Sequence, residues 1–373
     1  MPLLFGCALT REDLARRVGD FFQLFGVHLY ELGDGPERGV RCLKFRTGSG
    51  LEFDVAVDRG MDVASMTFRG VPIGWRSPAG LRSPNLHEFE AEDGFSWARS
   101  FSGLLTSCGL DHIHAPERDS GAHFHAPARP TIWYALHSRI GMAPARLKGY
   151  GTRWQGDQCY LFAEAEIRQA ALFGENLVLE RRIEVEVGAS TVSIRDRVVN
   201  AGFHVTPHAY LWHVNLGWPN VSDGARLIAP IAKTDWQMRD DEEGDRGPLV
   251  QSAPRNPATQ QVYDHTLRLN DEGTARAALV NDGFVSPGGE AGLALEIAYD
   301  GRAMPSLFQW QYFQEGAYVV AMEPCTTHAG TRSDWRVRGE FKMLGHGEAV
   351  DYRLEMTPHM GAIAIADLEA RLA

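Results

Sequence analysis

Along most of this chain hydrophobic positions alternate with polar ones, which is the pattern of half-buried β-strands. The stretch 41–75, "RCLKFRTGSGLEFDVAVDRGMDVASMTFRGVPIGW", predicts three strands with turns at 48–50 and 59–60. The stretch 177–202 alternates on both sides of a Gly-Ala-Ser turn, and 293–323 supplies further strands with glycine in each turn. Residue pattern alone therefore predicts a β-rich chain.

Helical patterns are confined to the two ends of the chain. Thr10 followed by "REDLARRVGDFF" predicts one helix with a hydroxyl N-cap, and "IADLEARLA" at 365–373 predicts a short final helix. Residues 338–359 predict another pair of strands. So many strands at roughly ten-residue spacing predict an all-β sandwich or barrel.

Two stretches interrupt the strand pattern. Residues 239–257 are charged and rich in Pro and Gly, and we expect a long surface loop there rather than a domain linker, because similar strands lie on both sides. Residues 76–130 are rich in Pro, His and charge, with little periodicity. So long a loop inside a compact domain is usually functional or covers a site.

The composition is that of an ordinary globular protein. Of 373 residues, 44% are hydrophobic and 23% charged, and the formal net charge of −11 argues against a nucleic-acid or anionic-membrane partner. The five cysteines are scattered without a CxxC pair, a reduced pattern that predicts a cytoplasmic protein. The start of the chain does not have the pattern of a signal peptide, and no window approaches the ~18 apolar residues of a membrane span.

One predicted strand ends in a carboxylate, and a charge at the end of a buried strand requires either an ion-pair partner or a functional role. In "YVVAME" the side chains of Val319, Ala321 and Glu323 share one face, so small neighbours leave room above the acid. A three-residue turn before this strand, with glycine in third place, would put Gln309 diagonally next to Glu323. We expect this turn; a two-residue turn would put Trp310 there instead. The alternative for the acid is a simple ion pair with an arginine.

A second predicted strand, "HAYLWHVNLGWP", carries His213 and Asn215 on one face and His208 on the other. A lone strand histidine is more often a satisfied core residue. The neighbouring Asn and the free carboxylate elsewhere favour an acid/base role. Between the ordinary pKa values of Glu and His, the His is protonated and the Glu is ionised. The two residues therefore make a natural acid/base pair.

Further histidines lie in the middle of the chain. "ALHSRIGMAPAR" places His137 and Arg139 on one side of an extended segment, where the arginine could bind hydroxyls or a carboxylate. Two H-x-H pairs precede them: His112, His114, His123 and His125. An H-x-H pair on a strand turns both imidazoles to one face, as a metal site requires. Loop histidines are common, however, and no acid at fixed spacing completes a ligand triad, so we predict no metal and no cofactor.

Six motifs occur in order between Val57 and Tyr352: "VDRGMDV", "GLLTSCGLD", "LHSRIGMAPA", "RDRVVNAGFHVTP", "LWHVNLGWP" and "VAMEPCTTHAG". Together they resemble the aldose 1-epimerase (galactose mutarotase-like) superfamily, closest to its uncharacterised aldose-1-epimerase-like branch. The resemblance implies an all-β antiparallel β-supersandwich with the sugar on its concave face. We accordingly divide the chain into an N-terminal helix with a lead-in strand, 1–40, and a single large carbohydrate-active domain, 41–373.

The resemblance also implies roles for particular residues. The acid of the "EP" motif, Glu323, would be the general base, and the strand histidine before "NL", His213, would be the general acid. We expect these two groups about one sugar ring apart, on opposite sides of the ligand. The resemblance assigns sugar binding to Arg59 and His137. The full set of candidate substrate-binding residues is Arg59, His137, Arg139, Asn215 and Gln309.

The motifs depart from the family pattern in places. The first histidine of the "LHG"-like motif is followed here by Ser138 instead of Gly, and the family's sugar-binding Asp has no clear counterpart. His213 lies two residues before Asn215, closer than in typical mutarotases, which leaves His208 as a substitute. On strand alternation only one of the two histidines can face the ligand.

We therefore predict a cofactor-free isomerase that interconverts the anomers of a free sugar or sugar derivative by acid/base ring opening and reclosure. Two alternatives stay open. One is a metal-using isomerase, epimerase or lyase acting on a keto or acidic sugar, and the other is a non-catalytic carbohydrate-binding protein. The expected partner is a small-molecule sugar, with no nucleic acid and no membrane, and a homodimer is left open.

Overall fold

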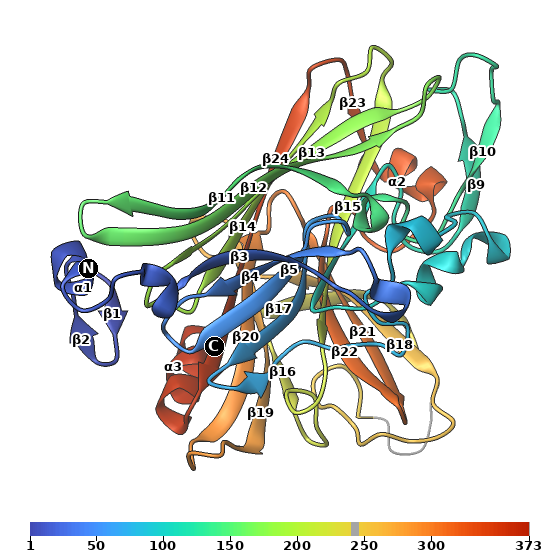
Figure 1. The fold of residues 1–373 in the computed structure, drawn as a ribbon. Coiled ribbons are helices and arrows are strands. Elements are labelled where there is room, and N and C mark those ends of the chain that lie inside the picture. The colour runs from blue at the N-terminus through green and yellow to red at the C-terminus, as the bar shows by residue number, and fades with distance from the viewer. Residues whose placement is uncertain (240–245, 373) are drawn as a thin grey trace.

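The computed structural model describes residues 1–239 and 246–372, whose strands form three main sheets and two small hairpins (Figure 1). Neighbouring strands within each sheet run antiparallel. The predicted all-β antiparallel fold is therefore confirmed. The loop expected at 239–257 lies in part outside the described residues, because 240–245 are not among them.

The first main sheet has eight strands and provides one wall of the molecule. Its long strands β11 to β14 run across the upper part of Figure 1. In spatial order its strands are β11 (Ala145–Gln155), β12 (Gln158–Ala170), β13 (Asn176–Glu186), β14 (Val192–Asn200), β24 (Ala349–Met360), β20 (Ala291–Asp300), β19 (Thr274–Val285) and β16 (Arg226–Ile228).

The second main sheet has seven strands and carries the candidate catalytic residues. Its order is β17 (Ile231–Met238), β18 (Gln260–Leu267), β21 (Ser306–Gln314), β22 (Ala317–Cys325), β15 (Thr206–Leu216) and β23 (Lys342–Leu344), with β8 (Leu105–Leu110) also paired to β15. The third sheet comprises β3 (Gly26–Glu31), β4 (Arg41–Arg46), β5 (Leu51–Ala56), β6 (Asp62–Phe68) and β7 (Val71–Pro72). The boundary expected at residue 40 falls between β3 and β4, which pair directly.

Short elements complete the described chain. The small hairpins are β1 (Leu3–Leu4) with β2 (Cys7–Ala8), and β9 (Glu117–Ser120) with β10 (Thr131–Tyr134). The helices are α1 (Arg11–Ala15), α2 (Arg332–Arg338) and α3 (Ala362–Leu372). Single turns of 3-10 helix are η1 (Phe21–Gln23), η2 (Gly35–Glu37), η3 (Pro84–Leu86), η4 (Glu92–Gly94), η5 (Ser96–Arg99) and η6 (Ile140–Met142).

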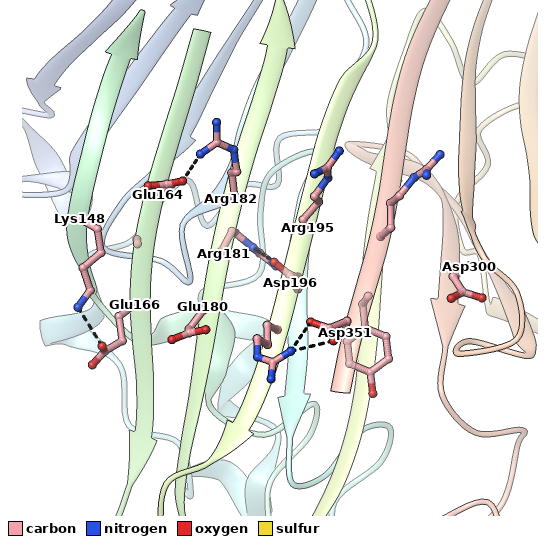
Figure 2. A pocket seen from close by; sticks show the side chains of 14 residues that line it. Lys148, Glu164, Glu166, Glu180, Arg181, Arg182, Arg195, Asp196, Asp300 and Asp351 are labelled. Carbon is pink, nitrogen blue, oxygen red and sulfur yellow. Dashed lines mark hydrogen bonds and ion pairs between the residues drawn. The ribbon is translucent and has the colours of Figure 1, made fainter. Parts of the chain in front are cut away.

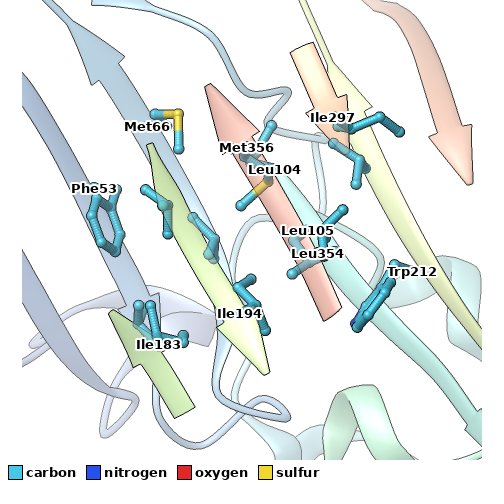
Figure 3. Close-up of a cluster of buried hydrophobic side chains, with 14 of the residues drawn as sticks. Phe53, Met66, Leu104, Leu105, Ile183, Ile194, Trp212, Ile297, Leu354 and Met356 are labelled. Atoms are coloured by element: carbon cyan, nitrogen blue, oxygen red, sulfur yellow. The ribbon is translucent and has the colours of Figure 1, made fainter. Parts of the chain in front are cut away.

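The hydrophobic core lies between the sheets and draws on all three of them (Figure 3). Phe53 comes from the third sheet, Ile183 and Leu354 from the eight-stranded sheet, and Trp212 from the seven-stranded sheet. Each is buried because alternate strand positions turn inward. The removal of so much apolar surface from water is the main force that holds the sheets together.

A buried ionic cluster also ties the sheets together. Arg181 of β13, which is fully buried, pairs with Asp196 of β14 at 2.6 Å and with Asp62 of β6 at 2.5 Å. Asp196 also accepts hydrogen bonds from Tyr210 and Trp212 of β15, at 2.7 and 3.0 Å. The cluster therefore fixes one face of β15, the strand whose other face carries the candidate histidine.

Most sequence expectations about elements are met, with three differences. The predicted cap is present, since Thr10 accepts from the backbone N–H of Asp13, but helix α1 ends at Ala15, earlier than expected. The two strands expected at 338–359 are present but do not pair with each other, because β23 pairs with β15 while β24 pairs with β14 and β20. Helix α2 was not expected.

Candidate active site

The acid and the histidine chosen from sequence meet on one face of the seven-stranded sheet. Glu323 lies on β22 and His213 on the adjacent strand β15. The His213 Nε2 and Glu323 Oε1 atoms are 3.2 Å apart, and each residue is only 4% exposed. The two are thus in direct contact, and the expectation that they lie a sugar ring apart is wrong for this structure.

The substitute histidine faces the other way. His208 Nδ1 lies 2.8 Å from the Leu110 carbonyl oxygen, and its Nε2 lies 2.7 Å from the Tyr352 hydroxyl. Tyr352 belongs to the core between the sheets. His208 is therefore a satisfied core residue, and the geometry favours His213 as the partner of Glu323.

The register of the hairpin before Glu323 differs from the expected one. Gln314 pairs with Ala317, so the turn has two residues, and Phe308 stands opposite Glu323. Gln309 consequently lies on the opposite face, where its amide donates to the Pro248 carbonyl oxygen at 2.8 Å. The prediction that placed Gln309 beside the acid is wrong. The side chain in the diagonal position is Trp310, as the shorter turn requires.

Aromatic rings surround the imidazole of His213. The ring centroids of Phe101, Trp310 and Trp97 lie 4.7, 5.6 and 5.8 Å from it. Trp97 and Phe101 stack on each other at 4.0 Å and come from the long irregular stretch 76–130. That stretch therefore covers the site, as its length and composition suggested.

Burial sets the protonation of the two central groups. It raises the pKa of Glu323 from 4.5 to about 8 and lowers the pKa of His213 from 6.5 to about 3, because a charged form loses its hydration inside the protein. The Asn215 hydrogen bond and the nearby His114 act on His213 as smaller influences, the first raising its pKa and the second lowering it. At neutral pH both groups are therefore uncharged, with the Glu323 carboxyl protonated and the His213 imidazole neutral.

His137 enters the same site from a strained turn. Its ring lies 5.6 Å from that of His213 and 4.6 Å from Trp97. His137 and Ser138 both have positive φ angles, 56° and 57°, which non-glycine residues rarely adopt. The His114 backbone N–H points at His137 Nδ1 from 3.4 Å, which leaves Nε2–H as the donor of this imidazole. Such strain typically persists where a side chain must be aimed at a functional site.

Asn215 lies next to His213 but has no free polar atom to offer a ligand. Its side chain is fully buried. Its Oδ1 lies 2.5 Å from His213 Nδ1, and its Nδ2 donates to the Gly103 and His213 carbonyl oxygens, both at 3.0 Å. The expectation that Asn215 binds substrate therefore lacks a geometric basis in this structure.

The two candidate arginines hold parts of the covering stretch. The buried Arg59 guanidinium donates to the carbonyl oxygens of Gly80, at 3.4 Å, and Ser100. Arg139 pairs with Glu90 at 2.6 Å, and its guanidinium lies over a phenylalanine ring of the same stretch. These contacts tie both arginines to the protein's own backbone and side chains, and their role in sugar binding stays a prediction.

The histidines of the two H-x-H pairs do not converge on one point. His114 lies beside His137, with ring centroids 6.2 Å apart, whereas His123 faces Glu175 and His125 stacks on His204. Among the residues that the structure describes, the one group of three close enough to hold a metal ion lies elsewhere: Asp235, Asp264 and His328. The carboxylates of that group already accept hydrogen bonds from Ser306, Thr266 and the Ala329 backbone, and Asp235 pairs with Lys233.

A hollow of about 450 Å³ lies on the polar face of the eight-stranded sheet (Figure 2). Several of its charged side chains pair across the strands: Lys148 with Glu166 at 3.1 Å, Arg197 with Asp351 at 2.9 Å, and Arg182 with Glu164. Such cross-strand pairs are typical of a solvated sheet face. The paired charges of this hollow therefore fit a solvated sheet face, whereas the Glu323 site brings buried titratable groups into contact.

Sequence reasoning missed the aromatic wall of the site. Trp97 and Phe101 sit in a stretch without periodicity, where no local pattern indicates which side chain turns inward. The H-x-H pattern indicates His114 only as a metal ligand, yet its ring lies 4.5 Å from that of Phe308, on the same face as Glu323. A signal was available for the unexpected helix α2, because Thr331 and Asp334 form a capping box.

Comparison with solved structures identifies the architecture as that of the galactose mutarotase-like β-sandwich proteins. A Klebsiella pneumoniae protein, provisionally assigned as an aldose 1-epimerase, matches with a TM-score of 0.82 at 21% identity, over 94% of this chain and 89% of its own. A galactose mutarotase-like protein from Clostridium acetobutylicum gives 0.55 at 14% identity, over 89% and 98% of the two chains. Galactose 1-epimerase from Lactobacillus acidophilus gives 0.53 at 11% identity, over 90% and 99%. At these identities the likeness establishes the fold.

The particular family follows from the sequence. The chain belongs to the family described as "Domain of unknown function (DUF4432)", whose model matches residues 37–357. No curated protein matches the chain. The resemblance to the aldose 1-epimerase superfamily is confirmed at the level of fold. Within the described residues, none of the helices combines the length and the apolar character needed to cross a membrane.

Proposed function

We propose that this protein is an aldose 1-epimerase-like isomerase, which interconverts the anomers of a sugar or sugar derivative through Glu323 and His213. The observation that carries the proposal is the 3.2 Å contact between the His213 Nε2 and Glu323 Oε1 atoms on a face lined by aromatic rings. Two buried titratable groups in contact, both with strongly perturbed pKa values, are a recognised mark of acid/base catalysis. The fold shared with galactose 1-epimerase supports the same reading.

The contact distance suits the chemistry of a cyclic hemiacetal. Its ring oxygen and its anomeric hydroxyl are both bonded to the same carbon, so an acid and a base that act on them can lie side by side. One group gives a proton to the ring oxygen while the other takes the hydroxyl proton. The ring opens to the aldehyde, the C1–C2 bond rotates, and closure on the other face returns both protons. General acid/base groups contribute about 10²–10⁴-fold each.

The surroundings of the pair fit a sugar. Aromatic rings such as Trp97, Phe101 and Trp310 offer flat apolar faces for the C–H groups of a pyranose, and His137 offers an Nε2–H donor for a hydroxyl. Since Glu323 and His213 are only 4% exposed, the stretch that carries Trp97 and Phe101 has to move for a sugar to enter.

The proposal is tested by following pure anomers in ¹H NMR spectra. Each sugar of a panel of free, phosphorylated and acidic aldoses is dissolved as one anomer, and the approach to equilibrium is recorded with and without protein. We expect acceleration for at least one sugar, and loss of the acceleration in Glu323→Gln. Glu315→Gln is the matched control, because Glu315 is an exposed acid in the turn before the same strand. If no sugar equilibrates faster with the wild-type protein, the proposal fails.

A further inference from the structure

Asn215 is held in one orientation by its own hydrogen bonds. Its Nδ2 group donates to two carbonyl oxygens, those of Gly103 and His213, both at 3.0 Å. Carbonyl oxygens only accept, so an exchange of the amide N and O atoms would set an oxygen against two oxygens. The atom that faces His213 Nδ1 at 2.5 Å is therefore Oδ1.

This orientation decides where the imidazole carries its hydrogen. An amide oxygen only accepts, so His213 Nδ1 has to be the donor. A neutral imidazole has a single N–H, and Nε2 is then left with a lone pair. This unprotonated Nε2 lies 3.2 Å from Glu323 Oε1.

The carboxyl group has few ways to exist as an anion at this position. Glu323 Oε1 is buried and has no aligned hydrogen bond, and an ionised carboxylate would place a second acceptor against the Nε2 lone pair. The titratable groups close enough to interact electrostatically with the pair are His114 and His137, beside His213, and Cys108 and Cys325, beside Glu323. Burial lowers the pKa of both histidines and raises that of both thiols, so all four are uncharged at neutral pH and supply no cation.

We propose that Asn215 is a positioning residue that fixes His213 as the base of the pair and so keeps Glu323 protonated as the acid. This reverses the roles that the sequence resemblance implies. The pKa of Glu323, raised by burial, and that of His213, lowered by burial, point in the same direction.

The catalytic part of this inference rests on the proposed function. Glu323 gives its proton to the ring oxygen as the C1–O5 bond breaks, and His213 Nε2 takes the hydroxyl proton as the C1=O bond forms. The site then holds a carboxylate and an imidazolium, whose Nδ1–H keeps its bond to Asn215. Ring closure reverses both transfers, so protons and electrons balance over the cycle.

The tautomer is measured directly on the full chain labelled with ¹⁵N-histidine. Long-range ¹H–¹⁵N correlation spectra distinguish an Nδ1–H from an Nε2–H imidazole, and the His213 signals are assigned by their absence in His213→Asn. At pH 7 we expect the Nδ1–H form of His213 in the wild-type protein, so this measurement needs no substitution that could disturb the site. An Nε2–H form or an imidazolium at pH 7 would overturn the inference.

Two substitutions then distinguish a positioning role of Asn215 from a purely structural one. Asn215→Asp keeps an acceptor for Nδ1 and adds a negative charge, so the Nδ1–H form persists and the acidic limb of the activity profile moves to higher pH. Asn215→Leu removes the acceptor, and we expect a mixture of tautomers and a roughly 10²-fold fall in kcat with little change in KM. Equal losses in both variants, with an unshifted pH profile, would contradict the positioning role.

The possible results distinguish a failure of this inference from a failure of the proposed function. An Nδ1–H imidazole in a protein that accelerates no anomerisation supports the tautomer assignment and refutes the function. Anomerisation by a protein with an Nε2–H imidazole supports the function and refutes the assignment of His213 as the base. Asn281→Leu, which removes another buried amide that donates to a carbonyl, controls for the loss of a buried Asn and should leave both the tautomer and the pH profile unchanged.

Discussion

The substitution Glu323→Gln should make the protein more stable at alkaline pH. Gln keeps the size of the acid but cannot ionise. The pKa of Glu323 is raised by burial, so the folded protein binds more protons than the unfolded chain between pH 4.5 and about 8. The free energy of unfolding of the wild-type protein therefore falls as the pH rises through this window, and the variant escapes that fall.

The magnitude follows from the size of the pKa difference. A rise from 4.5 to about 8 corresponds to about 5 kcal/mol, at about 1.4 kcal/mol per pKa unit. This is an upper limit, because water entry or a shift of the covering stretch would relieve part of the cost of the buried charge. We expect the stability difference between variant and wild type to grow by several kcal/mol between pH 5 and pH 9, most of it below pH 8.

The assay is urea denaturation of both proteins at intervals of half a pH unit. At each pH the dependence of the unfolding free energy on urea concentration (the m-value) is checked to be the same for both proteins. Groups that titrate equally in both proteins cancel in the difference. Glu315→Gln, in the exposed turn, serves as control and should show no growth of the difference. If Glu323→Gln behaves like this control, to within about 1 kcal/mol, the burial argument for Glu323 is refuted.

Three further predictions concern residues around the site. Arg59→Met leaves backbone carbonyl oxygens of the covering stretch without their hydrogen-bond donor, so amide hydrogen exchange in residues 76–102 should become faster while KM changes little. A large rise in KM without faster exchange would show that Arg59 binds the sugar. Arg181→Met leaves Asp62 and Asp196 buried without their cation and should cost about 3–5 kcal/mol by denaturant titration, and a loss below 1 kcal/mol would contradict the role of the cluster. A chelator should leave anomerisation unchanged, and loss of activity restored by added metal would favour the metal-using alternative.

Strand identity could be predicted from the sequence because alternation is a local property. The segments 41–75 and 177–202 became β4 to β6 and β13 to β14 with turns at the expected glycines. The face of His213 followed from the same alternation, since odd positions of β15 turn to the site and even positions to the core.

The register between strands was harder to predict because it depends on the length of a turn. The sequence pattern favours Gly316 as the third residue of a three-residue turn, but in the structure it is the second residue of a two-residue turn, with a φ of 79°. One residue of error moved every side chain of β21 to the other face and exchanged Gln309 for Trp310 beside Glu323.

Contacts made over long sequence distances were not predictable from local pattern. Trp97 and Phe101 reach His213 from a stretch without periodicity, and the separation of Glu323 and His213 is set by which strands become neighbours. The 3.2 Å contact of the pair depends on the pairing of β15 with β22, which no single strand encodes.

The central claim is that Glu323 and His213 act as one proton-transfer unit on a sugar. The most direct measurement is the rate of anomer exchange at equilibrium, by two-dimensional exchange NMR, for the wild type, Glu323→Gln, His213→Asn and the double variant. We predict a loss of about 10²–10⁴-fold in each single variant, with the double variant no slower than the slower single one, because groups that act as a unit are not additive. Near wild-type exchange in either single variant, or losses that multiply in the double variant, would contradict the account.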